Sequence, residues 1–110
     1  MAARKKEILQ VEDKRILDYE LVFIVSPEVN DESLEGIMSG IDQFITGKEG
    51  VISDVERWGK KRLAYPVKHF LEGNYVLTRF KMNPARCKEL EANLKISEEI
   101  LRHLLIKLSA

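Results

Sequence analysis

The sequence predicts an α+β fold in which a four-stranded antiparallel sheet carries two helices on one face. Hydrophobic periodicity changes along the chain in the order strand, helix, strand, strand, helix, strand. A proline lies inside the second predicted strand, and proline belongs at a sheet edge because it has no amide proton for the ladder. At 110 residues the chain is long enough for one domain with its own core.

The first strand is predicted within residues 18–29, DYELVFIVSPEV, and ends at Ser26-Pro27. Apolar residues on both of its sides indicate a central strand. A helix follows, capped by Asn30 or Asp31 and ended by the glycines at 47 and 50. Its apolar residues keep helical spacing: Leu34, Ile37, Met38, Ile41, Phe44 and Ile45.

The second strand is predicted over residues 51–67, and it contains Pro66. Its alternation loses phase near Trp58-Gly59, which indicates a β-bulge. A turn is predicted at residues 72–74, Glu-Gly-Asn, followed by a strand over residues 74–82.

Asn83-Pro84 predicts the start of a second helix, with a capping side chain followed by proline in the first turn. Cys87, Leu90 and Leu94 form its narrow apolar stripe. Residues 100–108 are predicted as the last strand, although their leucines leave a helix open as an alternative.

Two strand–helix–strand units with right-handed crossovers predict the ferredoxin-like βαββαβ arrangement. Its first and third strands are central, and its second and fourth strands are edges. The domain is expected over residues 17–110. Residues 1–16 are expected to be a charged extension, for which a short helix and disorder both remain open.

Composition argues against several classes of protein. Lys and Arg together equal Asp and Glu in number, so any binding to a polyanion must come from a local patch. Cys87 is the single cysteine, which excludes an internal disulfide and indicates a buried structural thiol. No signal peptide, transit peptide or transmembrane segment is recognised, so a cytosolic protein is expected.

No catalytic constellation is evident in the sequence. His69 and His103 have no zinc-ligand spacing with Cys87, and no glycine-rich phosphate loop is present. The carboxylates are scattered, without a pair suited to acid and base chemistry. We therefore expect no enzyme, no metal and no cofactor.

Positive charge gathers in residues 56–70, ERWGKKRLAYPVKHF. The cations are Arg57, Lys60, Lys61, Arg62 and Lys68. One interpretation is protection of an edge strand against pairing with other chains, and composition alone slightly favours it. The other is a phosphate-binding patch beside an apolar docking surface, favoured by arginines and by the interleaved Trp58, Tyr65 and Pro66.

A single-stranded RNA-binding domain of RNA-recognition-motif type, using the open sheet face, is an alternative. Residues 72–80, EGNYVLTRF, resemble its third-strand motif only in part, because an acid leads and the spacing differs. Tyr19, Phe23 and Phe80 are expected to be core residues rather than stacking platforms.

Residues 56–80, ERWGKKRLAYPVKHFLEGNYVLTRF, closely resemble the signature of the bacterial small-ribosomal-subunit protein S-six family. The opening DYELVFIVSPEV and the helix after it are similar too, so the likeness covers residues 18–108. The resemblance implies a ferredoxin-like structural constituent of the small ribosomal subunit, cytoplasmic and without catalytic activity. It also implies binding to the central domain of 16S ribosomal RNA as a heterodimer with the small basic ribosomal protein S-eighteen.

We assign roles within the matching stretch by chemistry. RNA contact is expected at Arg57, Lys60, Lys61, Arg62 and Lys68. Partner docking is expected at Leu63, Ala64, Tyr65 and Pro66. The first sixteen residues depart from the usual family pattern, and their cations Arg4, Lys5, Lys6, Lys14 and Arg15 are either further RNA contacts or parts of a solvated tail. No membrane or small-molecule substrate is implied.

Overall fold

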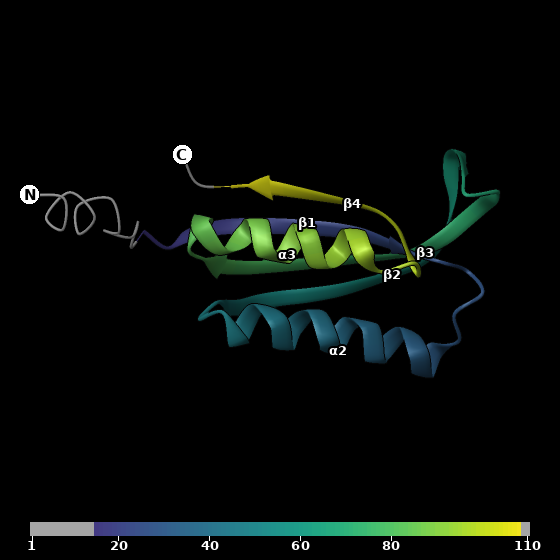
Figure 1. The fold of residues 1–110 in the computed structure, drawn as a ribbon. Coiled ribbons are helices and arrows are strands. Elements are labelled where there is room, and N and C mark those ends of the chain that lie inside the picture. Colours follow the sequence, from purple (N-terminus) through teal and green to yellow (C-terminus); the bar gives the residue numbers. More distant parts are fainter. Residues whose placement is uncertain (1–14, 109–110) are drawn as a thin grey trace, which may run out of the picture.

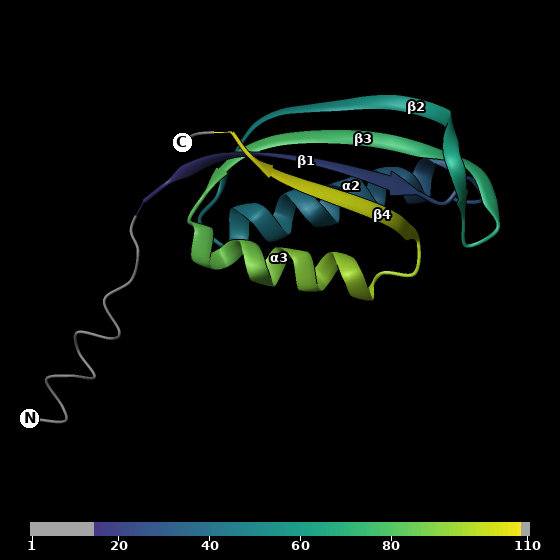
Figure 2. The ribbon, with the colours of Figure 1, turned by 90° about the horizontal axis from the view of Figure 1, so that it is seen from above.

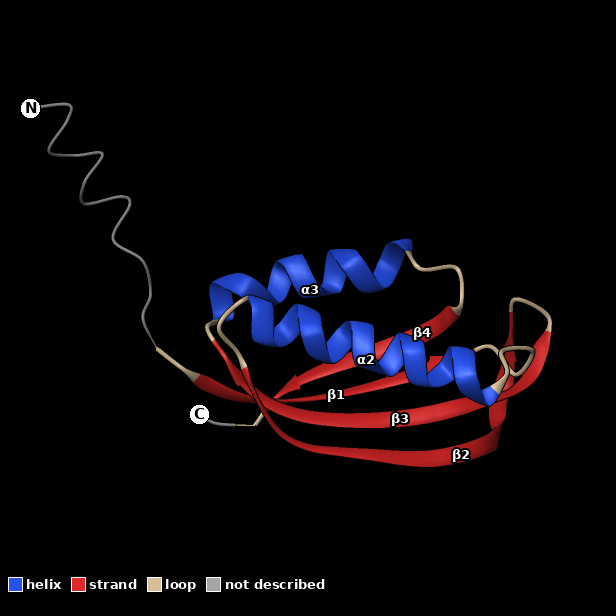
Figure 3. Ribbon diagram, turned by 90° about the horizontal axis from the view of Figure 1, so that it is seen from below, coloured by secondary structure: helices blue, strands red, loops and turns tan. Residues whose placement is uncertain are grey.

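The computed structural model describes residues 15–108 and contains six elements along the chain (Figure 1). They are β1 (Leu17–Val25), α2 (Asp31–Gly47), β2 (Val51–Val67), β3 (Phe70–Met82), α3 (Pro84–Ile96) and β4 (Ile100–Lys107). The strand order in the sheet is β2-β3-β1-β4, and all neighbours are antiparallel. Both helices cover one face (Figure 3). The predicted ferredoxin-like fold and its central and edge strands are confirmed.

The core lies between the helices and one face of the sheet. Alternate side chains of β1 and β3 point into it, because successive residues of a strand face opposite sides. The buried residues of the sheet and of the two helices in this cluster include Tyr19, Leu21, Phe23, Val25, Val76, Phe80, Met82, Leu34, Ile41, Ile45, Cys87, Leu90 and Leu94. Tyr19, Phe23 and Phe80 are therefore core residues, as predicted.

Both predicted helix starts are confirmed by their capping geometry. The Asn30 side chain accepts a hydrogen bond of 2.7 Å from the Ser33 amide. Asn83 Oδ1 accepts one of 2.8 Å from the Ala85 amide, and Pro84 follows as the first helical residue. These side chains satisfy amides that have no partner within the first turn of a helix. The segment from Ile100 is a strand, not a helix.

The turn predicted at residues 72–74 is wrong, because β3 begins at Phe70 and runs through them. The hairpin turns instead at Lys68 and His69, whose φ angles are +50° and +72°. Gly73 is needed for packing: a Cβ atom there would lie 2.4 Å from Ile24 Cγ2. Asn74 is buried and donates to the Ser26 carbonyl at 3.3 Å. Tertiary contacts, rather than turn geometry, explain these two residues.

Three register shifts interrupt the pairing of β2 with β3. The shift between Arg57 and Gly59 confirms the predicted bulge, and Gly59 has a φ of +86°. The largest shift lies between Arg62 and Val67, so residues 63–66 stand opposite Leu71 without ladder partners. Beyond this point the hairpin curls across the end of the sheet toward the start of β4 (Figure 2).

The expectations for the charged N-terminal extension fall on residues 1–14, outside the described residues, except for Arg15 and Ile16. Within residues 15–108, neither helix has the length and apolar character needed to cross a membrane.

Candidate nucleic-acid and partner interface

The β2–β3 hairpin carries the predicted cations, and its strand pairing sets the direction of each. Lys60, Lys61 and Arg62 stand opposite Asn74, Gly73 and Glu72. Since neighbouring residues in a strand face opposite sides, Lys61 lies on one side of the hairpin and Lys60 and Arg62 on the other. Lys68 occupies the turn. We call residues 60–72 the basic hairpin.

Four of the five predicted cations remain available for a ligand. Lys60, Lys61, Arg62 and Lys68 are exposed, and none forms an ion pair with another residue of the described chain. Arg57 differs, because its guanidinium lies 2.5 Å from Asp31 in the first turn of α2. That ion pair ties the root of the basic hairpin to the helix layer.

Trp58 is half exposed, at 42% of its surface. Its indole N–H donates to Glu56 at 3.3 Å, and the Lys61 ammonium lies 5.1 Å from the ring centroid. A cation in that position is attracted by the negative face of the ring. Trp58 therefore positions Lys61 and presents aromatic surface beside it.

The four residues predicted to dock a partner form the bulged segment of β2. Leu63 is buried, whereas Ala64, Tyr65 and Pro66 are exposed. The segment folds over the sheet around a cavity of about 140 Å³, whose lining includes Ile24 of β1, Tyr75 of β3 and Arg102 of β4. Leu63 thus supports the segment from below, and the other three residues present its outer surface.

The sheet face without helices, which we call the open face, carries an apolar row that we did not assign to a site from the sequence. Leu104, Ile106 and Leu108 are 58%, 39% and 51% exposed. Leu104 and Ile106 stand opposite Val22 and Glu20 of β1. The sequence carried a signal for this row, because its residues alternate onto one side of the last strand. An exposed apolar row that no helix covers indicates a contact surface.

Beside the apolar row, the open face carries a charged network with an excess of acid. The Arg79 guanidinium lies 3.1 Å from Glu20, 3.2 Å from Asp54 and 3.0 Å from Glu56. The hydrogen bond to Glu20 is the main cause that raises the pKa of Arg79 above its usual value. One cation therefore faces three carboxylates, which favours a basic ligand over an anionic one here.

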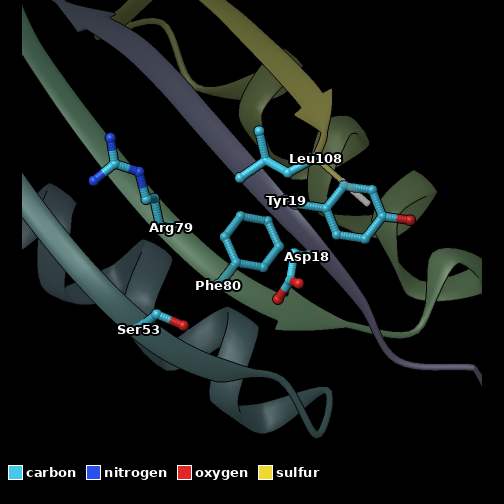
Figure 4. A pocket seen from close by; sticks show the side chains of 6 residues that line it. All are labelled: Asp18, Tyr19, Ser53, Arg79, Phe80 and Leu108. Atoms are coloured by element: carbon cyan, nitrogen blue, oxygen red, sulfur yellow. The ribbon is translucent and has the colours of Figure 1, made fainter. Parts of the chain in front are cut away.

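A hollow of about 410 Å³ opens where β4 ends. Figure 4 shows the side chains of the six residues that line it, with Arg79 and Asp18 as charged groups and Leu108 as an apolar one. The hollow joins the charged network to the apolar row. This part of the open face therefore has the mixed character of a protein-docking surface.

The open face lacks the paired aromatic platforms of an RNA recognition motif. Tyr19, Phe23 and Phe80 point into the core. Over the paired length of β1 and β3, the aromatic residue on the open face is Tyr75 alone. The cations lie on the basic hairpin instead. The stacking alternative thus loses the geometry on which it depends.

Cys87 is buried at 8% exposure, and desolvation by this burial raises the pKa of its thiol. A thiol held protonated is a poor nucleophile, which agrees with the predicted structural role. Among residues 15–108, no three His, Cys, Asp or Glu side chains come together as metal ligands.

The fold and the basic hairpin define a small ferredoxin-like protein with a surface suited to nucleic acid. Residues 18–107 match the family of ribosomal protein S6, and the chain belongs to that family. It is therefore a structural constituent of the small ribosomal subunit, located in the cytoplasmic ribosome, and not an enzyme. The predicted family is confirmed.

Individual relatives agree with this assignment. The small ribosomal subunit protein bS6 of Moorella thermoacetica is 42% identical over 91 residues, 83% of this chain and 93% of the relative. That of Dehalococcoides mccartyi strain CBDB1 is 36% identical over 102 residues, covering 93% of this chain and 94% of the relative. The crystal structure of 30S ribosomal protein S6 from Thermotoga maritima superposes with a TM-score of 0.82 at 30% identity, covering 86% of this chain and 89% of that one.

Proposed function

We propose that this protein binds the central domain of 16S ribosomal RNA as a heterodimer with the basic ribosomal protein S-eighteen. The observation that carries the proposal is the basic hairpin, which presents Lys60, Lys61, Arg62 and Lys68 to solvent without ion partners in the described chain. Arg57, at the root of the hairpin, remains a proposed RNA contact, but its guanidinium is already bonded to Asp31 at 2.5 Å. Contacts between these cations and phosphates would fix the register of the protein on a folded RNA.

The two ligands are supported on different surfaces. The bulged segment, with Ala64, Tyr65 and Pro66 exposed and Leu63 beneath, lies next to the open face. The open face adds an apolar row and an excess of acid, which complement a basic protein. A neutral chain that recruits a basic partner gains phosphate-binding charge without carrying it.

RNA binding is tested with a central-domain fragment of 16S ribosomal RNA, with and without S-eighteen, at two salt concentrations. We expect tight binding only with the partner, because the hairpin alone neutralises few phosphates. The triple variant Lys60/Lys61/Arg62→Ala should bind more weakly and with a shallower salt dependence, by roughly 0.7 to 0.9 in log–log slope for each phosphate that is no longer neutralised. Equal binding with and without the partner contradicts the heterodimer.

A control is the double variant Lys88→Ala and Lys95→Ala, which removes two exposed cations from α3 on the opposite layer. It should leave RNA affinity almost unchanged. An equal loss for each charge removed would mean that net charge, and not the basic hairpin, governs binding.

The partner surface is tested by placing a carboxylate in the apolar row. Leu104→Asp should weaken binding to S-eighteen by at least about tenfold, since an unpaired charge would be buried at the interface. Ile96→Asp is the control, because Ile96 is 79% exposed on α3, away from the sheet. Calorimetry measures the affinity of both variants for S-eighteen, after a check that both melt like the parent. Normal binding by Leu104→Asp would refute the location of the partner on the open face.

A further inference from the structure

We infer that the basic hairpin holds one unpaired RNA nucleotide in a hollow on the side away from the bulged segment. The hollow has a volume of about 420 Å³. We call it the hairpin hollow, and its lining residues are Pro27, Arg62, His69, Phe70, Leu71 and Glu72. This inference rests on the proposed function and adds base recognition to a surface that was assigned phosphate contacts alone.

Three separate parts of the chain build the hairpin hollow. Arg62 and Glu72 face each other across the β2–β3 ladder. His69 reaches it because the two positive-φ residues of the turn reverse the chain directly before Phe70. Pro27 comes from the connection between β1 and α2. The preceding residue, Ser26, holds this connection in place, because its amide donates a hydrogen bond of 2.8 Å to the Glu99 carbonyl. The wall at Pro27 therefore comes from a connection that the rest of the fold holds in place.

The lining matches the phosphate and the base of a nucleotide. Arg62 is exposed and without an ion partner in the described chain, so its planar guanidinium is available for a phosphate. Pro27 and Phe70 are half-buried, and Leu71 is 58% exposed, so together they offer apolar surface to the face of a base. The His69 imidazole adds a polar group at the rim.

The presence of Glu72 favours a nucleotide over a bare phosphate as the ligand of the hairpin hollow. A carboxylate beside Arg62 is unfavourable in a site built only for phosphate, because it repels the anion. It is favourable when a base brings an amino group, since Glu accepts hydrogen bonds from such groups. The hairpin hollow should therefore prefer cytosine, adenine or guanine over uracil, whose single N3–H donor lies between two carbonyl oxygens that repel a carboxylate.

Two sides of one hairpin then serve different ligands. The cavity under Tyr65 borders the open face, where we place the protein partner. The hairpin hollow contains Pro27 of the β1–α2 connection and opens on the other side. Arg62 belongs both to the cations of the basic hairpin and to the lining of the hairpin hollow.

The test uses the full chain with S-eighteen and the 16S central-domain fragment, with chemical probing of base edges as the readout. We expect the parent chain to protect at least one unpaired base that carries an amino group. Leu71→Asp places a charge against the apolar surface, and Glu72→Leu removes the acceptor, so each should remove this protection and weaken binding by roughly tenfold. Arg62→Gln should weaken binding and also lower the salt slope by about one phosphate contact.

The substituted residues are exposed, so the variants should melt like the parent chain. Lys88→Gln on α3 matches the charge change of Arg62→Gln and should preserve the protection. Replacing the protected nucleotide by uridine should reproduce the effect of Glu72→Leu in the parent chain and have no further effect in that variant.

The outcomes separate the two proposals. If the parent complex binds but no base protection depends on Leu71 or Glu72, the nucleotide site is refuted and the phosphate patch stands. If the protected base is a uridine, the role of Glu72 is refuted. If the parent chain and S-eighteen together do not bind the RNA, both proposals fail.

Discussion

Tyr65 and Arg102 meet although they belong to the two opposite edge strands of the sheet. The Arg102 guanidinium donates a hydrogen bond to the Tyr65 hydroxyl and lies 5.2 Å from the centroid of its ring. In the strand order β2-β3-β1-β4, two strands separate them. The contact exists because the bulged segment carries Tyr65 across the end of the sheet, and it closes the cavity over Ile24 and Tyr75.

This contact should contribute measurably to the stability of the hairpin. We expect Tyr65→Ala to lower the free energy of unfolding by about 1 kcal/mol, because it removes both the cation–π contact and a hydrogen bond. Tyr65→Phe should have roughly half of that effect, because it keeps the ring. A double-mutant cycle with Arg102→Ala, followed by urea unfolding, isolates the pair, and strictly additive effects would show that the residues do not interact.

A substitution in the hairpin turn should stabilise the protein. Lys68 and His69 occupy the left-handed region without being glycine, and two-residue loops of this kind favour Asn-Gly. The double variant Lys68→Asn and His69→Gly should raise the free energy of unfolding by about 1 kcal/mol. The same variant should bind RNA more weakly, because it removes a proposed contact. Parallel gains in stability and RNA affinity would contradict that role.

Gly73 should be intolerant of a methyl group, while glycines in α2 should tolerate one. Gly73→Ala places Cβ against Ile24, within 2.4 Å of a side-chain carbon and 3.2 Å of the Val25 carbonyl, and should cost about 1–3 kcal/mol of stability. Gly40→Ala meets nothing within 4 Å and should stabilise the helix by up to about 1 kcal/mol. Thermal unfolding of both variants checks the contrast, and a neutral Gly73→Ala would refute the packing argument.

Asp42 should make stability depend on pH. Burial raises the pKa of this carboxyl above its usual value, so the folded state holds its proton more tightly than the unfolded state. Its favourable contribution is complete below the unfolded pKa, near 4, and is lost as pH rises through the folded pKa. Asp42→Asn should therefore be more stable than the parent at pH 7, with a difference that shrinks toward pH 3.

Urea unfolding at several pH values measures this effect. Glu35→Gln is the control, since Glu35 is exposed on the same helix and its replacement changes charge equally. An unchanged difference between parent and Asp42→Asn from pH 3 to pH 7 would contradict the argument from burial.

Much of the candidate site was predictable from local pattern. The five cations and the bulge at Trp58-Gly59 lie in one contiguous stretch, so their proximity needed no tertiary information. The alternation of apolar residues along β4 was visible in the sequence, but it did not show that they form a binding surface. The hairpin hollow was not predictable, because Pro27 and Arg62 are 35 positions apart in the sequence and meet only in the folded chain.

The sequence by itself determined the order of elements, the caps at Asn30 and Asn83 and the edge position of the strand with Pro66. Each of these depends on interactions within a few residues, and periodicity reports them directly. Only the tertiary structure decided where the hairpin turns and how it curls. Gly73 and Asn74 have the composition of a turn, yet contacts with Ile24 and Ser26 hold them in a strand. Packing and buried hydrogen bonds outweigh a local turn preference, because an unfilled core or an unpaired buried amide is the larger penalty.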